Sequence, residues 1–384
     1  MSHEGNPLRM GMVGGGQDAF IGAVHRSAAR LDDSMRLVAG ALSSTPERSV
    51  RSGEAIHLSP DRTYPSWEAM LEGELALPSD QRIEVVSIVT PNHMHYPVAR
   101  AFVEAGFHVI LDKPMVNTLQ EAQELAALVD KKGVIFCVTY NYSGYPMIKQ
   151  ARHMVGTGQI GAVRKVIVEY HQGWLATRLE ETGQKQADWR TDPTKAGSGG
   201  AIGDIGSHAE HLARYVTGLK MEEICADLTR FVPGRALDDD ASVLIRYTSG
   251  ARGMLSASQI CVGQQNNLRL RVWGETGGLE WQQEDPNQLR TWSSDGPEQV
   301  YYRGESMLSA ESLEATRIPM GHPEAYLEAF ANLYRAVALA IRNDHSGDQA
   351  IDYPDVNDGL MGVQFINAVV QSSEGKPHWV SLGR

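Results

Sequence analysis

Three features are scarce in this chain of 384 residues. It has only three cysteines, Cys137, Cys225 and Cys261, too few and too scattered for a disulfide framework or a zinc site. Basic residues number 35 against 47 acidic ones, and the net charge of −12 argues against nucleic acid or an anionic membrane as partner. No apolar run reaches the ~18 residues that a spanning helix needs. We therefore expect a cytoplasmic protein without a metal site.

The first part of the sequence alternates short apolar runs with helical patterns. This alternation predicts βαβ units and a doubly wound parallel sheet, with buried strands at 8–13, 36–42, 85–89, 108–111 and 134–140. From about residue 145 a polar loop and several strand-like runs follow, and two helical patterns close the chain. We predict an N-terminal Rossmann dinucleotide-binding domain over 1–144. We predict an α+β domain over 145–384, built on a large, mostly antiparallel sheet.

A glycine run follows the first predicted strand and precedes a predicted helix. In this context the backbone amides of Gly14, Gly15 and Gly16 and the helix N-terminus favour a dinucleotide pyrophosphate. Two alignments are open for the third position of the fingerprint. Either Ala19 occupies it, or residues 17–19 are a short insertion and Gly22 packs the helix against the strand.

The end of the second strand normally selects between NAD and NADP, through an acidic residue that binds the ribose 2′-hydroxyl. Ser43 stands at that position here, followed by Ser44 and, further on, by Arg48. Serines can bind a hydroxyl or a phosphate, and Arg48 is a candidate partner for a 2′-phosphate. NAD is slightly favoured because no arginine follows Ser43 directly, and NADP is not excluded.

The segment 199–208 is rich in glycine and ends in a predicted helix over 207–217. It places Asp204 four residues before His208, so both lie on one face if the helix has already begun. An imidazole is suited to general acid–base catalysis near neutral pH, and Asp204 would orient it or bind substrate hydroxyls. The alternatives are a buried structural histidine and an acidic residue favoured by the helix dipole.

A second candidate segment, Asp112-Lys113-Pro114, closes a strand of the first domain. Ligands of such sheets bind beyond the carboxyl ends of the strands. Lys113 is therefore a candidate for proton exchange and hydroxyl binding, and the alternative is a surface lysine paired with Asp112. Together with the segment 199–208 it indicates an enzyme that transfers a hydride.

Aromatic and basic residues supply further candidates for substrate binding. Tyrosine and tryptophan faces suit the C–H faces of a pyranose, whereas the two basic residues either hold an anionic substituent or belong to a solvated loop. The candidates are Tyr140, Tyr142, Tyr145, Trp189, Arg190, Lys195 and, more remotely, His345. The acidic run 238–240 lacks the spaced ligands of a calcium loop and is predicted to be a solvated turn.

These motifs, in this order, resemble the Gfo/Idh/MocA family of NAD(P)-dependent sugar and polyol oxidoreductases. The resemblance covers nearly the whole chain and rests on the glycine loop, residues 90–95, residues 112–114 and the segment 199–208. It implies NAD or NADP as cofactor, a cis Pro114, an open sheet in the second domain that binds substrate, and a homodimer or homotetramer formed through that sheet. It also implies that Lys113, Asp204 and His208 surround the nicotinamide and the reacting hydroxyl. Further cofactor contacts are expected from Thr90, Pro91, Asn92, His95, Asp112 and Lys113.

The chain departs from the family pattern at several places. Asp112 replaces the usual glutamate, His211 stands where aspartate is common, and the tyrosine-rich segment 140–146 replaces one that contains arginine. These departures leave the substrate class open.

The resulting hypothesis is an oxidoreductase that removes hydride from a secondary hydroxyl, expected at C3, of a small-molecule sugar, glycoside or cyclitol. The alternative is a redox-neutral glycoside hydrolase that oxidises C3 transiently, with Tyr142 or Tyr145 as the base at C2. Its candidate substrates include carboxylated and sulfonated sugar glycosides. A third hypothesis is a cofactor-binding regulator without turnover.

Overall fold

A computed structural model describes residues 6–343 and 352–382, which form two compact units. The described residues of Met1–Val116, Gln120–Asn141 and Leu327–Leu360 make up the first unit. The second contains those of Asn117–Leu119, Tyr142–Tyr326 and Met361–Arg384. After a short excursion at residues 117–119, the chain passes from the first unit to the second after residue 141, close to the expected boundary at 144/145. It later returns to the first unit, which differs from the continuous second domain predicted over 145–384.

The first unit is built on a parallel sheet of five strands in the order β2-β1-β3-β4-β5. All the strands predicted for this region are present, with ends shifted by up to two residues. They are β1 (Leu8–Gly14), β2 (Met35–Ala41), β3 (Val85–Val89), β4 (His108–Leu111) and β5 (Phe136–Val138). The intervening helices are α1 (Phe20–Leu31), α2 (Pro46–Ala55), η1 (Pro60–Arg62), α3 (Trp67–Ala76), η2 (Asn92–Met94), α4 (His95–Glu104) and α5 (Leu119–Lys132). Strand order reverses between β1 and β3, where open α/β sheets bind their ligands.

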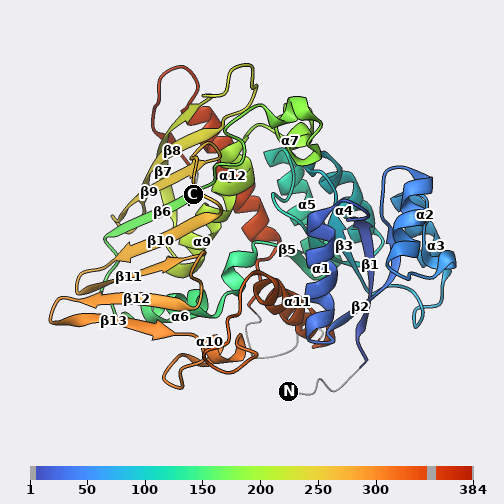
Figure 1. Ribbon diagram of the computed structural model, residues 1–384, viewed down its shortest axis with the longest axis horizontal. Helices are drawn as coiled ribbons and strands as arrows, with labels where there is room; N and C mark the ends of the chain where they lie inside the picture. The colour runs from blue at the N-terminus through green and yellow to red at the C-terminus, as the bar shows by residue number, and fades with distance from the viewer. Residues whose placement is uncertain (1–5, 344–351, 383–384) are drawn as a thin grey trace. The chain divides into compact units, whose positions relative to one another are not determined.

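Helix α11 (Tyr326–Arg342) completes the first unit and lies beside α1 (Figure 1). Its buried face includes Phe330 and Tyr334. The ring of His25 on α1 lies 5.0 Å from that of Phe330, and its Nδ1 is 2.8 Å from Tyr334 Oη. Ser87 of β3 joins the same cluster, with Oγ 3.0 Å from Tyr334 Oη. Burial lowers the pKa of His25 to about 4, so this histidine is a neutral core residue at physiological pH.

The second unit has a sheet of nine strands in the order β13-β12-β11-β10-β6-β9-β8-β7-β14. Neighbouring strands are antiparallel except for the central pair β6 and β9, which is parallel. The strands are β6 (Lys165–His171), β7 (Met221–Thr229), β8 (Asp240–Tyr247), β9 (Arg252–Ser258), β10 (Asn267–Trp273), β11 (Gly277–Gln282), β12 (Gln288–Ser293), β13 (Gly296–Tyr302) and β14 (Val380–Ser381). The Rossmann-type parallel sheet followed by a mostly antiparallel one confirms the predicted fold class.

Helices cover one face of this sheet. Helices α6 and α9 pack against each other and against the sheet, where alternate residues of β10 are fully buried (Figure 1). On the opposite face Leu244 and Met254 remain 48% and 43% exposed. The helical segments are η3 (Asn141–Gly144), α6 (Pro146–Gly156), η4 (Leu179–Thr182), α7 (Lys185–Arg190), α8 (Pro193–Ala196), η5 (Ile202–Gly206), α9 (Ser207–Thr217), α10 (Ala310–Glu314) and α12 (Val356–Ser372), and α12 begins in the first unit, which includes residues up to Leu360. Among the described residues, no helix has both the length and the apolar character needed to cross a bilayer.

Candidate active site

The glycine loop after β1 leaves no room for side chains. Gly14 and Gly15 adopt left-handed φ values of +82° and +71°, which glycine tolerates without a steric penalty. A Cβ on Gly22 would lie 2.2 Å from the carbonyl oxygen of Gly15, and a Cβ on Gly16 would lie 2.5 Å from that of Leu42. Gly22 is thus the glycine that packs α1 against the loop, and residues 17–19 are the insertion. The bare backbone beside the start of α1 fits a pyrophosphate group.

Arg48 of α2 is bound to this loop. Its Nη2 lies 2.8 Å from the carbonyl oxygen of Gln17 and 2.8 Å from Asp18 Oδ2. Ser43 and Ser44 lie on the turn after β2, half-buried and exposed respectively. A 2′-phosphate at this turn would have to compete with Asp18 for Arg48.

His95 links two loops at the carboxyl edge of the parallel sheet. Its Nδ1 is 2.9 Å from the carbonyl oxygen of Pro114, and its Nε2 is 2.9 Å from that of Thr90. His95 is 1% exposed, and burial lowers its pKa, while the negative charge of Asp112 and the bonds to the two carbonyls oppose that shift. His95 therefore ties the loop after β3, which contains Pro91 and Asn92, to the loop after β4. Its predicted contact with the cofactor stays a prediction.

The peptide bond between Lys113 and Pro114 is cis, as the resemblance implied. The carboxylate of Asp112 organises this turn: its Oδ1 accepts hydrogen bonds from the backbone amide of Lys113 and from Thr139 Oγ1, both at 2.9 Å. The second of these bonds fastens the turn to the end of β5. Asp112 thus fixes the backbone that carries Lys113.

In the second unit, Asp204 and His208 lie on one helical stretch. Residues 202–206 form a π-helical turn, in which the Ser207 amide donates to the Ile202 carbonyl, and α9 continues from it. Such turns often occur at functional sites. The helix has therefore begun at Asp204, as required for the two side chains to share a face.

The carboxylate of Asp204 is held by two side chains from other elements. Its Oδ2 accepts from Arg190 Nε at 3.0 Å and from Gln259 Nε2 at 2.9 Å. Arg190 belongs to α7, and its guanidinium carbon lies 4.2 Å from the ring centroid of Trp189. The positive charge of Arg190 is thus balanced inside the protein, which weakens the case for a substrate anion there.

Lys195 pairs with acidic residues of its own loop. Its Nζ lies 3.1 Å from Asp188 Oδ2 and 3.3 Å from Asp192 Oδ2, and these bonds, that to Asp188 first, raise its pKa. This is the arrangement expected of a solvated polar loop, the alternative considered for Lys195 above. His345 lies outside the described residues.

The aromatic residues of segment 140–146 are buried. Tyr140, Tyr142 and Tyr145 are at most 2% exposed. The ring of Tyr142 meets that of His208 edge-on at 4.9 Å, and Tyr145 packs against Trp281 at 5.2 Å. Within the second unit, Tyr142 and Tyr145 therefore support His208 and the core. Their predicted contact with substrate remains untested.

Tyr142 also belongs to a polar cluster that the sequence did not reveal. Its hydroxyl is 2.5 Å from that of Tyr170, whose hydroxyl donates to Asn266 Oδ1 at 2.7 Å. Burial raises the pKa of Tyr142 to about 12, so the phenol stays protonated at neutral pH.

The residues that surround Asp204 and Tyr142 meet at one end of the central strands of the second sheet. The carboxyl ends of the parallel strands β6 and β9 meet there, with the start of the antiparallel strands β8 and β10. Tyr170, Gln259 and Asn266 lie at those strand ends, far apart in sequence. No local spacing marks them, because only the strand register makes them neighbours.

The prediction of a solvated turn at 238–240 is wrong. Asp238 and Asp239 are 6% and 1% exposed, and both accept backbone hydrogen bonds. An acidic run is buried here because main-chain amides of other segments satisfy it. Within residues 6–343 and 352–382, no group of three or more His, Cys, Asp or Glu side chains is placed to hold a metal ion.

Comparison with known proteins decides the family. Residues 8–140 match the model of an oxidoreductase family with an NAD-binding Rossmann fold, and residues 148–280 match the GFO/IDH/MocA C-terminal domain. The chain belongs to the Gfo/Idh/MocA oxidoreductase family. As a member of that family it has an NAD-binding Rossmann domain, in agreement with the loop geometry described above.

Relatives of this Gfo/Idh/MocA chain match it over nearly their whole length. The uncharacterized oxidoreductase YfiI of Bacillus subtilis is 36% identical over 98% of this chain and 97% of its own. Levoglucosan dehydrogenase of Pseudarthrobacter phenanthrenivorans is 25% identical, with 98% of both chains covered. An inositol dehydrogenase homolog from Azotobacter vinelandii, solved with NADH and myo-inositol, is 36% identical, covers 98% of both chains and superposes with a TM-score of 0.91.

Proposed function

We propose that this protein oxidises a secondary hydroxyl of a neutral cyclic polyol or sugar. The observation that carries the proposal is the Asp204–His208 pair on one helical stretch, with Asp204 held by Arg190 and Gln259. An imidazole next to a fixed carboxylate is a combination suited to taking a proton from an alcohol. Two relatives support the same class of substrate: one is levoglucosan dehydrogenase, and the other is an inositol dehydrogenase homolog solved in complex with NADH and myo-inositol.

The roles of the residues divide between the two units. When bound, NAD+ supplies the acceptor for the hydride. Gly14, Gly15 and Gly16 would hold its pyrophosphate, and we assign the ribose to Ser43 and Ser44. We assign proton transfer to Lys113 and His208, and hydroxyl binding and orientation of the imidazole to Asp204. Additional cofactor contacts are assigned to Thr90, Pro91, Asn92, His95 and Asp112.

A neutral substrate is favoured over an anionic one. Arg190 and Lys195, the basic residues considered for an anionic substituent, both have carboxylate partners within the second unit. A carboxylated or sulfonated substrate would have to break one of these pairs. The oxidised carbon, expected at C3 of a pyranose, stays a prediction.

No observation favours the redox-neutral glycoside hydrolase. Both of its candidate bases, Tyr142 and Tyr145, are buried, and burial raises the pKa of Tyr142 to about 12, which makes deprotonation near neutral pH costly. A dehydrogenase needs no base at C2. Net oxidation is therefore the simpler reaction for these residues.

A substrate panel tests the proposal. The purified protein is incubated with NAD+ and with myo-inositol, levoglucosan, glucose, glucuronate or an aryl glucoside, and reduced nicotinamide is followed by absorbance. We expect one NADH for each neutral polyol consumed, little turnover of glucuronate, and a ketone whose position is read by NMR. Repeated phenol release from the aryl glucoside at constant nicotinamide, or preferred turnover of glucuronate, would contradict the proposal.

A second proposal concerns the association of copies of this chain. Leu244 and Met254 are exposed apolar side chains on the open face of the second sheet, and we propose that this face joins copies of the chain into a homodimer or homotetramer. Light scattering after size-exclusion chromatography measures the mass, and Leu244→Glu should lower it. A monomeric wild-type protein would refute this assignment. The cytoplasmic location remains a prediction that fractionation of the source cells would test.

A further inference from the structure

Asp238 receives three consecutive backbone amides from the segment that leads to Asp204. Its Oδ1 lies 2.6 Å from the Gly200 amide nitrogen, and its Oδ2 lies 2.8 Å from that of Ile202. Its carbonyl oxygen accepts from the Ala201 amide at 2.9 Å. The first amides of a helical segment have no partner within the helix. Here one buried aspartate satisfies three of them.

The main chain at Gly200 lies very close to the main chain at Asp238. A Cβ on Gly200 would lie only 2.0 Å from the carbonyl oxygen of Asp238. Glycine at position 200 therefore allows the main chain of one segment to reach the main chain of the other. The start of the catalytic segment is held by backbone contact as well as by a side chain.

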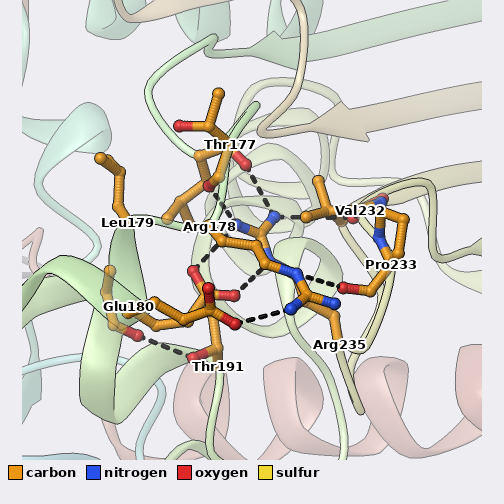
Figure 2. A network of polar contacts seen from close by, with 12 residues as sticks. Thr177, Arg178, Leu179, Glu180, Thr191, Val232, Pro233 and Arg235 are labelled. Carbon is orange, nitrogen blue, oxygen red and sulfur yellow. Dashed lines mark hydrogen bonds and ion pairs between the residues drawn. The ribbon is translucent and has the colours of Figure 1, made fainter.

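The segment that carries Asp238 is itself firmly anchored, as Figure 2 shows for its neighbour Arg235. Arg235 is 9% exposed; it donates to the carbonyl oxygens of Leu175 and Thr177 at 2.7 and 2.8 Å and pairs with Glu180 at 3.1 Å. The Asp239 carboxylate accepts from two amides of the connection between β7 and β8 and lies 3.5 Å from Arg235. Asp238 thus projects from a rigid part of the fold.

The same segment also positions a partner of the Asp204 carboxylate. The backbone amide of Gln259 donates to the carbonyl oxygen of Asp239 at 2.9 Å, and the Gln259 side chain holds Asp204 Oδ2. Residues 238 and 239 therefore fix the main chain before Asp204 and one of the two donors to its side chain.

We propose that Asp238 is a positioning residue for the reaction, which sets the register of residues 200–206 and so the direction in which Asp204 and His208 point. The role rests on the proposed function, since it acts through the two residues to which catalysis is assigned. The loss of Asp238 should lower kcat more than it weakens binding of NAD+.

The cap depends on the charge of Asp238. Burial raises the pKa of this carboxyl to about 6, while the bonds from Ile202 and Gly200 oppose the shift. The adjacent carboxylate of Asp239 adds to the rise in the pKa of Asp238, and Asp239 itself lies 3.5 Å from Arg235, which pairs with Glu180. Protonation would turn one capping oxygen into a donor facing an amide donor. The cap should therefore weaken as pH falls through about 6.

The loss of the cap at low pH differs from global unfolding, because protonation of Asp238 changes the stability of the fold in the opposite direction. The pKa of Asp238 is raised in the folded state, so the folded protein binds this proton more readily than the unfolded chain. The contribution of this group to stability accordingly rises as pH falls from about 6 towards the ordinary aspartate range. Activity should fall over the same interval in which this group favours the folded state.

Hydrogen exchange of the purified protein without substrate tests the proposal directly. In Asp238→Asn at pH 7 we expect the amides of residues 200–202 to exchange at least about tenfold faster than in the wild type, because one capping acceptor becomes a donor. Asp240→Asn, a change at the adjacent acidic residue, should leave this exchange unchanged. With myo-inositol and NAD+, kcat of Asp238→Asn should fall at least about tenfold while the Kd for NAD+ changes less than about twofold, and the acidic limb near pH 6 should disappear.

Unchanged exchange at 200–202, or unchanged kcat in a variant whose exchange is accelerated, would overturn the proposal. If Asp238→Asn does not fold, the wild type provides the test. Protection of these amides, corrected for intrinsic exchange, should be lower at pH 5 than at pH 7, and equal protection would overturn the role. A failure to oxidise myo-inositol would refute that substrate alone, since the exchange experiment needs none.

Discussion

Arg190 Nε donates to Asp204 Oδ2 over 3.0 Å, although the two residues belong to different helical segments of the second unit. Their side chains are 22% and 16% exposed, so the pair is only partly screened by water. The guanidinium serves the protein's own carboxylate. Arg190 therefore helps to fix the orientation of the Asp204 carboxylate, and we expect its substitution to lower turnover.

Arg190→Gln should lower kcat/KM for the substrate by roughly 10- to 100-fold, the scale of a lost charge-assisted hydrogen bond worth about 1.5–3 kcal/mol. Steady-state kinetics with a neutral polyol and with the matching uronate measures the effect. Lys185→Gln, on the exposed start of α7, is the control and should stay within about twofold of wild type. If Arg190→Gln lost only the uronate activity, Arg190 would be an anion-binding residue after all.

Lys113→Met and His208→Ala should each reduce kcat by about 100-fold or more, the usual loss when an acid–base group is removed. Calorimetric titration should show little change in the affinity for NAD+, because neither change touches the glycine loop. Near-normal turnover in both variants would eliminate the assigned proton-transfer residues.

The chain should bind NAD+ at least as tightly as NADP+. Arg48 is already paired with Asp18 and with the carbonyl oxygen of Gln17, so a 2′-phosphate gains little from it. Calorimetry with both cofactors measures the preference. Tighter binding of NADP+ by more than about tenfold, or ~1.4 kcal/mol, would contradict it, and Arg48→Ala would then show whether Arg48 is the phosphate ligand.

Gly22→Ala should weaken NAD+ binding and lower stability together. The new methyl group would lie 2.2 Å from the Gly15 carbonyl oxygen, so the loop and α1 must separate. Overpacking of this kind costs about 1–3 kcal/mol, which thermal unfolding with and without NAD+ can resolve. Gly156→Ala is the matched control, since nothing lies within 4 Å of a Cβ there. Equal effects of the two substitutions would mean that Gly22 has no special role in the loop.

Local patterns predicted the parallel strands and the helix over 207–217, because apolar periodicity and glycine turns act within a few residues. The cluster of His25 and Tyr334 joins positions 309 residues apart, so an amphipathic pattern near residue 330 could not show which sheet it covers. Asp238 was misjudged for a related reason. An acidic run is normally solvated, and Asp238 can be buried because the amides of Gly200 and Ile202, distant in sequence, donate hydrogen bonds to its carboxylate.

The residues of the candidate site also differ in whether a local sequence pattern marks them. Asp204 and His208 were visible because they are four residues apart on one segment. Their supports, Gln259, Tyr170 and Asn266, come from three strand ends and carry no motif of their own. The candidate catalytic residues can thus be found from their spacing in the sequence, whereas the residues that hold them become neighbours only through the strand register.

The return of α11 to the first unit has a consequence for biosynthesis. A ribosome releases the parallel strands and α1 early, but Phe330 and Tyr334, which cover His25 and Ser87, emerge only after strands β6 to β13 of the second sheet. The cofactor-binding half therefore waits with an uncovered apolar face through the synthesis of nearly two hundred further residues, roughly ten to forty seconds at typical elongation rates. During that interval another molecule or segment must cover this apolar face to prevent aggregation. A fragment that ends at residue 144 would need such cover permanently.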